Sequence, residues 1–316
     1  MQSHPAVSVL ICTRNRADEL VHALRSVLSN RHTAFEVIVI DQSDNDTTRE
    51  VVLSCDAEAA GRHISLRHVP TDTRGLSLAR NLAIAQARGE IIAFTDDDCT
   101  VGEDWVENIA TLFTDDPDLY MVYGQVWMPE EYKNRDEIIV PCLYFDTRRE
   151  LKEGDIFGMG ANMAFRKSLT EKIGVYDTVL GAGGVFGGGE DFDFTYRAQR
   201  AGLKVVAEPT LTAIHKSFRS RDHWNQVTYA YGRGDAAFYG KHARCGDRWA
   251  RATIRNRIAL YVARNLTRLI SGRIRITDRT YIHGFLDGLK QSNAHAVDTP
   301  RRLYVSGEMM LKGDAS

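Results

Sequence analysis

The sequence predicts an α/β fold with a mostly parallel central sheet covered by helices, followed by a helical C-terminal extension. Two observations lead to this prediction. Short β-branched runs alternate with helical patterns through the first half of the chain, which is typical of parallel strands joined by crossover helices. From about Asp222 onward the pattern is helical and rich in arginine. A chain of 316 residues, 43% of them hydrophobic, is long enough to bury a substantial core.

The expected strands are the apolar runs at residues 7–12, 35–40, 64–69, 91–94, 122–126, 161–165 and 204–207, the last followed by Ile214 and His215. Helical patterns occupy residues 20–28 and 76–87, where apolar side chains recur every three or four positions. A charged and less regular segment, residues 130–158, separates the fifth and sixth strands. We expect acceptor selection to lie in this segment and in the C-terminal region.

The composition excludes several classes of protein. The net charge of −2 provides no overall basic field, so we expect no nucleic-acid partner. Five scattered cysteines without a CxxC pair argue against a disulfide framework or a zinc site and indicate a reducing compartment. We find neither a signal-peptide pattern nor an apolar run of the ~18 to 20 residues that a membrane span needs. The expected location is the cytoplasm.

Polar side chains follow three of the expected strands. Thr13 to Arg16 follow the first strand, Asp41 follows the second, and Asp96 to Asp98 follow the run at 91–94. In parallel sheets ligands bind beyond the carboxyl ends of the strands. Strand-ending turns favour Asp and Asn in any case, which explains one such cluster. Three clusters at the same edge are better explained by a binding site.

The three consecutive aspartates need a counter-charge, because like charges packed this closely repel one another. A hard divalent cation, Mn²⁺ or Mg²⁺, is a natural match for carboxylate oxygens on a rigid strand end. A nucleotide diphosphate is the expected co-ligand, and Arg74 and Arg80 could meet its phosphate oxygens. The alternative interpretation is a solvated acidic turn with two ordinary arginines on a helix surface.

Four segments occur in an order that resembles a known family: "VSVLICTRNR", "VIVIDQSDND", "RGLSLARNLAIAQARGEIIAFTDDDC" and "GGGEDFDFTYRAQRAG". Together they are similar to inverting family 2 glycosyltransferases of the GT-A fold, over residues 6–215. The resemblance implies a single nucleotide-binding domain with a mixed sheet, residues 1–221, before an Arg-rich, mainly helical extension, residues 222–316. It also implies transfer of a sugar from a nucleotide-diphosphate donor, with a UDP-sugar expected. The expected acceptor is a saccharide or a lipid-linked group, as in polysaccharide biosynthesis.

The resemblance assigns roles to residues of the nucleotide site. Thr13 and Arg14 match the strand end that lines the nucleotide pocket, and Asp41 matches the aspartate that contacts the base. Arg80 falls in the segment near the donor phosphates, and Arg74 lies shortly before it in the same segment.

The resemblance also implies a metal site. The family's DxD motif maps onto Asp96 and Asp98, the first near the ribose or sugar and the last ligating the metal. Three consecutive aspartates leave this register ambiguous, so Asp97 could take either role, and Asp96 is also a candidate metal ligand. His215 resembles the distant histidine that completes the metal site or touches the diphosphate. Its alternative is a purely structural histidine.

The segment "GGGED" matches the family's acidic motif and completes the expected mechanism. Asp191 resembles the general base that removes the acceptor hydroxyl proton, and Glu190 would position the acceptor or the base. An acidic helix N-terminus favoured by the helix dipole is the alternative. That alternative leaves unexplained six glycines between Gly181 and Gly189, which we interpret as a loop that closes over substrate.

The function expected is a metal-dependent inverting glycosyltransferase, in which the metal offsets charge growing on the departing diphosphate. A nucleotidyltransferase is the rival enzyme, since it also pairs carboxylates with Mg²⁺. It would leave Glu190 and Asp191 without a role. A non-catalytic nucleotide-sugar binding protein is the rival from another class.

The C-terminal extension allows two interpretations. Between Lys241 and Ser316 there are fifteen Lys and Arg against six Asp and Glu. One helical face carries apolar residues, flanked or followed by arginines: Ile254, Ile258, Tyr261, Val262, Leu266 and Leu269, with Arg257, Arg264, Arg268, Arg273, Arg275 and Arg279. Packing of this face on the catalytic domain is favoured. The alternative is peripheral contact with the anionic inner face of a membrane.

Overall fold

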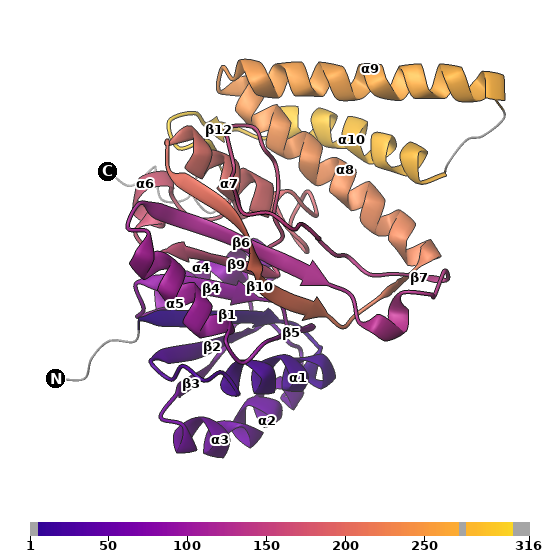
Figure 1. The fold of residues 1–316 in the computed structure, drawn as a ribbon. Coiled ribbons are helices and arrows are strands. Elements are labelled where there is room, and N and C mark those ends of the chain that lie inside the picture. The colour runs from indigo at the N-terminus through magenta and orange to yellow at the C-terminus, as the bar shows by residue number, and fades with distance from the viewer. Residues whose placement is uncertain (1–5, 272–275, 306–316) are drawn as a thin grey trace. The chain divides into compact units, whose positions relative to one another are not determined.

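The computed structural model describes residues 6–271 and 276–305, without the side chains of 264–271 and 276–278 (Figure 1). Contacts divide the chain into two compact units. The sheet unit comprises Met1–Arg74, Leu78–Val175 and Thr195–Arg219, and the helical unit comprises Gly75–Ser77, Tyr176–Phe194 and Ser220–Ser316. The predicted boundary after residue 221 stays a prediction, because these contacts assign two earlier segments to the helical unit as well.

The secondary structure follows the predicted order and adds short elements. The elements are β1 (Val7–Thr13), α1 (Ala17–Leu28), β2 (Phe35–Asp41), α2 (Thr47–Ser54), α3 (Asp56–Gly61), β3 (Ser65–Pro70), α4 (Leu76–Gln86), β4 (Ile91–Thr95), β5 (Cys99–Val101), α5 (Trp105–Asp115), β6 (Leu119–Trp127), η1 (Glu130–Tyr132), β7 (Ile138–Ile139), β8 (Arg149–Glu150), β9 (Asn162–Arg166), α6 (Leu169–Ile173), α7 (Glu190–Arg200), β10 (Lys204–His215), β11 (Arg219–Ser220), α8 (Arg221–Arg244), α9 (Arg248–Ser271), α10 (Ile276–Ala294), β12 (Val297–Asp298) and β13 (Leu303–Tyr304).

The central sheet of the sheet unit is mixed, in the order β3-β2-β1-β4-β9-β6-β10-β5, with β8 paired to β10. The first four strands are mutually parallel. Strand β9 lies antiparallel between β4 and β6, and β6 is parallel to β10. Every residue of β2 is buried, as expected for a strand covered on both faces. The predicted α/β fold with a mixed, mostly parallel sheet is confirmed.

The register of the sheet brings the predicted strand ends to one edge. Thr13, the last residue of β1, pairs with Asp41, the last residue of β2. Strand β4 runs parallel to β1 and ends at Thr95, directly before the three aspartates. At the far side of the sheet His215, the last residue of β10, pairs with Cys99 of β5. Pairing between neighbouring strands therefore brings together residues as distant in the chain as Thr13 and His215.

A buried asparagine holds the middle of the sheet, where β10 departs from regular pairing with β6 between Ala207 and Thr212. The side-chain amide of Asn162 donates to the carbonyl oxygens of Gln125 and Leu211, at 2.7 and 3.2 Å. A Cβ on Gly124 would lie 2.2 Å from that amide nitrogen, so only glycine fits there. These bonds satisfy carbonyl groups that the irregular pairing would otherwise leave without a partner.

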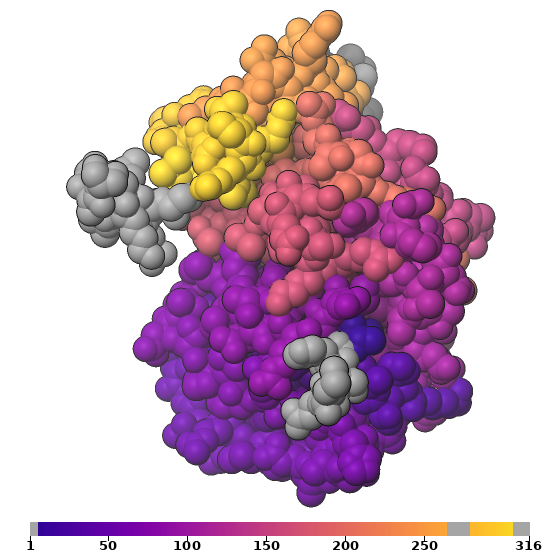
Figure 2. All heavy atoms as spheres, turned by 90° about the vertical axis from the view of Figure 1, so that its left-hand side faces the viewer, coloured from indigo at the N-terminus to yellow at the C-terminus, as the bar shows by residue number. Residues whose placement is uncertain are grey.

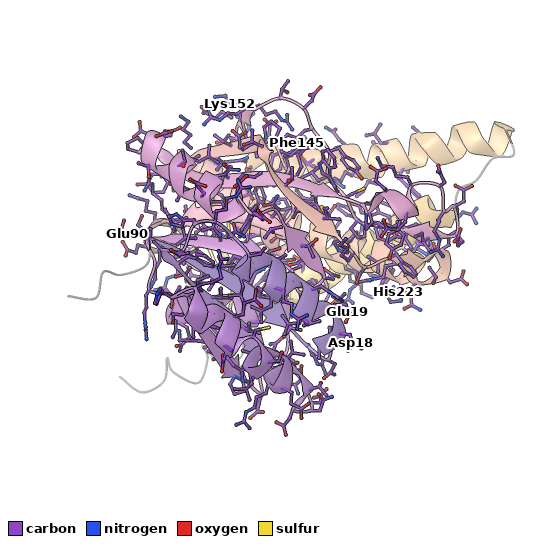
Figure 3. All side chains as sticks on the ribbon, turned by 60° about the horizontal axis from the view of Figure 1, so that its bottom comes forward. Asp18, Glu19, Glu90, Phe145, Lys152 and His223 are labelled. Carbon is purple, nitrogen blue, oxygen red and sulfur yellow. The ribbon has the colours of Figure 1, made fainter. Side chains whose placement is uncertain are left out.

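The surface of the sheet unit carries mixed charges. Exposed side chains such as Asp18, Glu90 and Lys152 point away from the ribbon (Figure 3). Figure 2 shows, in indigo to purple, the face that the early segments of this unit present on one side. Acidic and basic side chains therefore both occur on this surface.

Within the helical unit, glycines allow α8 and α10 to pack closely. A Cβ on Gly284 would lie 2.1 Å from the carbonyl oxygen of Tyr229, and one on Gly232 would lie 2.2 Å from that of Tyr281. The third long helix, α9, is tied to α8 by Arg257, whose Nη1 lies 3.1 Å from Asp235 Oδ2. Three long helices therefore form the scaffold of this unit.

The predicted apolar face of the extension lies on α9. Of that face, Ile254, Ile258 and Tyr261 are half-buried, whereas Val262 is 50% exposed. Of the flanking arginines, Arg257 is half-buried and Arg279 is exposed. Six members of the pattern lie outside the described side chains, namely Arg264, Leu266, Arg268, Leu269, Arg273 and Arg275. In the parts of the chain that the structure describes, no helix is both long and apolar enough to cross a membrane.

Candidate functional site

The second of the three aspartates is buried in a network at the end of β1. Asp97 is 4% exposed. Thr13 Oγ1 donates to its Oδ2 at 2.8 Å, and Arg16 Nη1 donates to its Oδ1 at 2.9 Å. Burial raises the pKa of the Asp97 carboxyl to about 7, although the positive charge of Arg16 opposes this shift. Arg16 is therefore a counter-charge supplied by the protein itself.

The third aspartate turns its two oxygens to two different partners. Arg16 Nη2 donates to Asp98 Oδ2 at 2.5 Å, while His215 Nε2 lies 3.6 Å from Asp98 Oδ1. The other ring nitrogen of His215 is 2.9 Å from the carbonyl oxygen of Ser217, which directs Nε2 toward Asp98. Burial raises the pKa of Asp98, but the charges of His215 and Arg16 outweigh it and lower that pKa overall.

The same place fits a divalent cation. Single ligand atoms of Asp98, Cys99 and His215 lie within 4.8 Å of one another, and all three residues are buried. Burial raises the pKa of the Cys99 thiol well above its usual value, and sulfur is a soft donor that hard cations do not prefer. The remaining donors are a carboxylate oxygen and an imidazole nitrogen, which suit Mn²⁺ better than a soft metal.

The first aspartate contacts one of the predicted phosphate-binding arginines. Arg80 Nη2 lies 3.9 Å from Asp96 Oδ1. The side chain of Arg80 is only 2% exposed, and its guanidinium carbon lies 5.5 Å from the centroid of the Phe94 ring. Arg80 is therefore not an ordinary helix-surface charge, because a buried guanidinium is stabilised only by specific partners. Asp96 is more open, with 37% of its side chain exposed.

The other predicted arginines meet at an aspartate that the sequence analysis did not select. Asp44 Oδ2 lies 3.5 Å from Arg14 Nη2, and Asp44 Oδ1 lies 2.5 Å from Arg74 Nη2. A hydrogen bond from Asn15, followed by the charges of these arginines, lowers the pKa of Asp44. All of these side chains are exposed, so Arg14 and Arg74 form a separate, solvent-accessible group.

The aspartate predicted to contact the base is buried and oriented. Asp41 Oδ1 accepts from the backbone N–H of Ser43 at 2.9 Å, and Asp41 Oδ2 is 2.9 Å from His68 Nε2. His68 was not expected at the site. Its only sequence signal was its place near the end of the weak third strand, β3.

The structure thus brings Thr13, Asp97, Asp98 and His215 into one network. Arg16, which the sequence analysis did not assign to the site, connects Asp97 to Asp98. The sequence offered a usable signal for Arg16. It stands in the polar cluster that follows β1, and three consecutive aspartates require a nearby cation. The assumption that this cation must be a metal concealed the role of the arginine.

The second predicted group, Glu190 and Asp191, belongs to the helical unit and forms the first turn of α7. Glu190 is 8% exposed and Asp191 is half-buried. The first turn is closed by a bond of 3.0 Å from the backbone N–H of Asp193 to the carbonyl oxygen of Gly189. Both acids therefore sit at the positive end of the helix dipole.

The glycine loop before α7 has a defined conformation that requires its glycines. Four of the six have a positive φ, namely Gly181, Gly183, Gly187 and Gly189. The backbone N–H of Gly181 donates to Gly188 O at 3.1 Å, which closes the loop upon itself. A Cβ on Gly189 would lie 2.7 Å from Gly234 O of α8. Backbone geometry and close packing thus explain the glycines, and closure over a substrate stays a prediction.

Comparison with known proteins gives a consistent result. Residues 8–174 match the family described as "Glycosyl transferase family 2". A glucosyl-dolichyl phosphate glucuronosyltransferase of Haloferax volcanii is 28% identical over 198 residues, which cover 56% of this chain and 58% of that protein. A pre-mycofactocin glycosyltransferase of Mycobacterium tuberculosis is 28% identical over 76% of this chain and 47% of its own. The chain thus spans about half the length of these relatives.

Solved structures resemble this chain in fold. The mannosyltransferase PcManGT of Pyrobaculum calidifontis, in complex with GDP-Man and Mn²⁺, has a TM-score of 0.61 at 20% identity, covering 93% of this chain and 87% of its own. S. aureus TarS 1-349, in complex with UDP-GlcNAc, has a TM-score of 0.52 at 18% identity, over 72% of this chain and 66% of its own. At these identities the likeness concerns the fold alone.

Proposed function

Because this chain belongs to glycosyl transferase family 2, we propose that it transfers a sugar from a nucleotide-diphosphate donor to an acceptor hydroxyl. The transfer inverts the anomeric carbon and requires a divalent cation. The observation that carries the proposal is a network at the ends of β1, β4 and β10, in which the half-buried Arg16 pairs with the buried Asp97 and Asp98, and Asp98 faces His215. Ligands of such sheets bind beyond the carboxyl ends of the strands, which supports a donor site here.

The donor is a nucleotide-diphosphate sugar, and a UDP-sugar is proposed. Asp41, held by Ser43 and His68, offers a carboxylate to the base or ribose. The buried guanidinium of Arg80 beside Asp96 would meet phosphate oxygens, for which a planar guanidinium is suited. The complexes of PcManGT with GDP-Man and of TarS with UDP-GlcNAc support a donor of this class.

Asp98 and His215 would hold the cation, Mn²⁺ or Mg²⁺, with Asp96 as a further candidate ligand. When bound, a divalent cation supplies Lewis-acid stabilisation of the charge on a departing diphosphate. Arg16 bonds Asp98 Oδ2 and so directs the opposite oxygen, Oδ1, toward His215. This arrangement orients the carboxylate before any cation binds, which reduces the reorganisation that binding requires.

Asp191 would accept the proton of the acceptor hydroxyl, and Glu190 would orient the acceptor. A deprotonated hydroxyl attacks the anomeric carbon from the face opposite the diphosphate, so the product has the inverted configuration. Water must be kept out, because it would otherwise accept the sugar. The acceptor is a saccharide or a lipid-linked group, and the relative from Haloferax volcanii, a glucosyl-dolichyl phosphate glucuronosyltransferase, favours the latter. Transfer to such an acceptor would take place at the cytoplasmic face of a membrane.

A thermal-shift screen tests the proposal directly. Nucleotide-diphosphate sugars are added singly, with Mn²⁺ or with chelator, and a bound donor raises the melting temperature by mass action. We expect one donor class to raise it only when Mn²⁺ is present. With the selected donor, slow hydrolysis without acceptor separates an enzyme from a binding protein, and proton NMR of the product gives its anomeric configuration. The absence of any shift across the panel would contradict the proposal, and release of pyrophosphate from nucleoside triphosphates would indicate a nucleotidyltransferase.

A further inference from the structure

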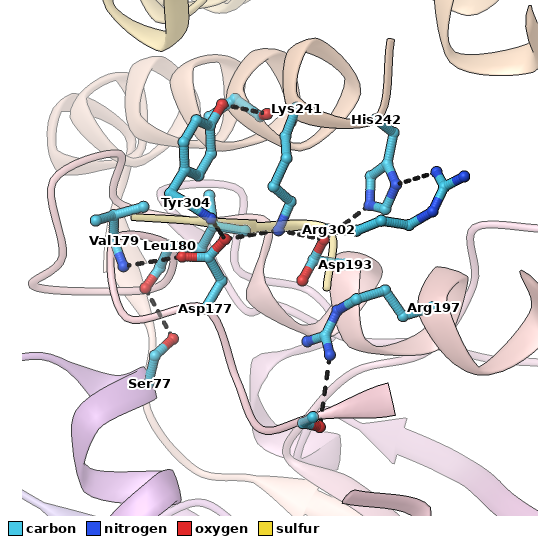
Figure 4. Close-up of polar contacts among 12 residues, drawn as sticks. Ser77, Asp177, Val179, Leu180, Asp193, Arg197, Lys241, His242, Arg302 and Tyr304 are labelled. Atoms are coloured by element: carbon cyan, nitrogen blue, oxygen red, sulfur yellow. Dashed lines mark hydrogen bonds and ion pairs between the residues drawn. The ribbon is translucent and has the colours of Figure 1, made fainter. Parts of the chain in front are cut away.

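A buried group of charged side chains ties together the helical unit around the glycine loop (Figure 4). Lys241 of α8 donates to Asp177 Oδ2 at 2.6 Å and lies 2.7 Å from Asp193 Oδ1. None of the three side chains is more than 1% exposed. Removing three charges from water is strongly unfavourable unless they pair with one another. One ammonium here pairs with two carboxylates, so the remaining negative charge must be stabilised by further hydrogen-bond donors.

The two carboxylates lie at the two ends of the glycine loop, residues 181–189. Asp177 precedes the loop by four residues, and Asp193 follows it by four. Lys241 therefore joins the segment that enters the loop to the helix that leaves it. The same helix, α8, contacts the loop at a second place, because a Cβ on Gly234 would lie 2.3 Å from the carbonyl carbon of Gly188.

The last described strands complete this group. His242 Nε2 is 2.9 Å from Asp193 Oδ1, and Arg302 Nη1 is 3.2 Å from His242 Nδ1. An arginine donates only, so Nδ1 accepts and Nε2 carries the proton that it donates to Asp193. The backbone N–H of Tyr304, in β13, donates to Asp177 Oδ2 at 2.9 Å. Each carboxylate therefore has a second partner besides Lys241.

Stability alone does not account for such a group. Replacing a buried ion triad by apolar residues is often neutral or even stabilising, whereas defined geometry is a property that ionic groups can provide. The geometry that this group defines is that of the first turn of α7. Asp193 closes this turn through its backbone N–H to Gly189 O, and its side chain is held from two directions by Lys241 and His242. Glu190 and Asp191 lie inside that turn, together with Phe192.

We propose that Lys241 is a positioning residue that fixes Asp191, and with it Glu190, in the orientation needed for proton transfer from the acceptor. This inference rests on the proposed function, in which Asp191 accepts that proton. Lys241 acts through Asp177 and Asp193, and the segment from Arg302 to Tyr304 supports the same two carboxylates. The Lys241 side chain touches no reacting group.

Steady-state kinetics separate positioning from stability. With Lys241→Met we expect kcat to fall about 100-fold, the loss that a misplacement of about 1 Å can produce, at an unchanged donor KM. The neutral combination of Asp177→Asn, Lys241→Met and Asp193→Asn removes all three charges at once, and we expect it to regain thermal stability without regaining kcat. Arg257→Met is the control, because it removes a partly buried cation of the same unit that pairs with Asp235 and not with Asp177 or Asp193. Recovery of kcat together with stability would overturn the proposal.

Amide hydrogen exchange gives a readout that does not depend on activity. Peptides that cover residues 178–192 should exchange faster in Lys241→Met than in Arg257→Met, because the ends of the loop are no longer joined. Equal exchange in the two variants would overturn the proposal. If the wild-type protein transfers no sugar but exchange rises as expected, the ordering of the loop by Lys241 is supported, and the proposed function is the part that fails.

Discussion

Arg16 and Asp98 are joined by a hydrogen bond of 2.5 Å although 82 positions separate them in the chain. Nη1 of the same guanidinium donates to Asp97 Oδ1, and Nη2, which bonds Asp98, also donates to Ser217 Oγ. One arginine therefore connects the loop after β1, the aspartates after β4 and the segment after β10. The repulsion within the three aspartates is relieved by the protein before any cation binds.

We expect Arg16→Met to destabilise the protein by about 2 kcal/mol, between the value of an exposed pair and that of a buried pair. The variant leaves two buried carboxylates without their arginine, so Mn²⁺ should raise its melting temperature more than it raises that of the wild type. Arg14→Met, at an exposed arginine of the same segment, is the control. An identical response to Mn²⁺ in wild type and Arg16→Met would show that the cation and Arg16 do not share these carboxylates.

Asp98→Asn should weaken both donor binding and turnover, because the oxygen that faces His215 loses its negative charge. The wild type should lose activity in excess chelator and regain it with Mn²⁺. Asp104→Asn changes an exposed aspartate that pairs with Arg31, and we expect it to behave as wild type. Isothermal titration with the selected donor, with and without Mn²⁺, measures the effect. Full activity in chelator would contradict a metal-dependent reaction.

Asp191→Asn should lower kcat by about 10² to 10⁴, the usual contribution of a positioned general base, while donor affinity stays nearly constant. Asparagine keeps the shape of the side chain and removes the proton acceptor. Asp222→Asn, at the first turn of α8, is the matched control for loss of an acid at a helix start. A fall in kcat of less than about tenfold, or a large loss of donor affinity, would contradict the assignment of Asp191 as the general base.

Stability should fall as the pH falls from about 6.5 to about 4, because of His242. Burial lowers the pKa of this residue in the folded protein to about 4, whereas an unfolded histidine titrates near 6.5. Between these values the unfolded chain binds the extra proton, so acid favours unfolding, by roughly 3 kcal/mol in total. Urea titrations at pH 7 and pH 5 should show a smaller loss in His242→Gln than in wild type. His283→Gln, at an exposed histidine of α10, should keep the wild-type loss.

The arginine-rich helix α9 offers a test of the proposed membrane contact. If the protein binds an anionic membrane surface, it should co-sediment with anionic but not with neutral vesicles, and added salt should weaken this. The exposed apolar residues Leu260 and Val262 are natural contacts, and Leu260→Ser should then reduce sedimentation. Absence of sedimentation with either vesicle at low salt would leave α9 as a packing element.

The parallel half of the fold could be predicted from the sequence because its signals are local. Strands β1, β2 and β4 are mainly apolar runs, interrupted by Ser8 in β1 and Glu36 in β2, and each ends in a polar turn that reaches the site. Strand β10 was harder to predict, since Pro209 interrupts the apolar pattern and the single strand Lys204–His215 was expected as two pieces. The antiparallel insertion of β9 has no local signature. The resemblance to family 2 glycosyltransferases, by contrast, predicted the mixed sheet correctly.

Pairings between distant residues escaped the sequence analysis. Arg16 was visible as one polar residue among four, but nothing local indicates that it contacts Asp97 and Asp98. Lys241 was not selected at all, because a lysine in a charged helical stretch is normally exposed, whereas this one is fully buried. Both cases depend on which segments meet in three dimensions, and one sequence without its fold does not contain that information in readable form.

The antiparallel pairing of β10 with β5 has a consequence for the order of events during synthesis. Strands β1 to β4 can pair as soon as the first 95 residues exist, but β5 must wait for the residues of β10, about 100 positions later. At a synthesis rate of roughly 5–20 residues per second, this delay lasts on the order of 5 to 20 s. During that interval Asp98 exists without His215, and the edges of β4 and β5 that later take β9 and β10 are open. A nascent chain paused near residue 200 should therefore need protection from aggregation that the finished chain does not.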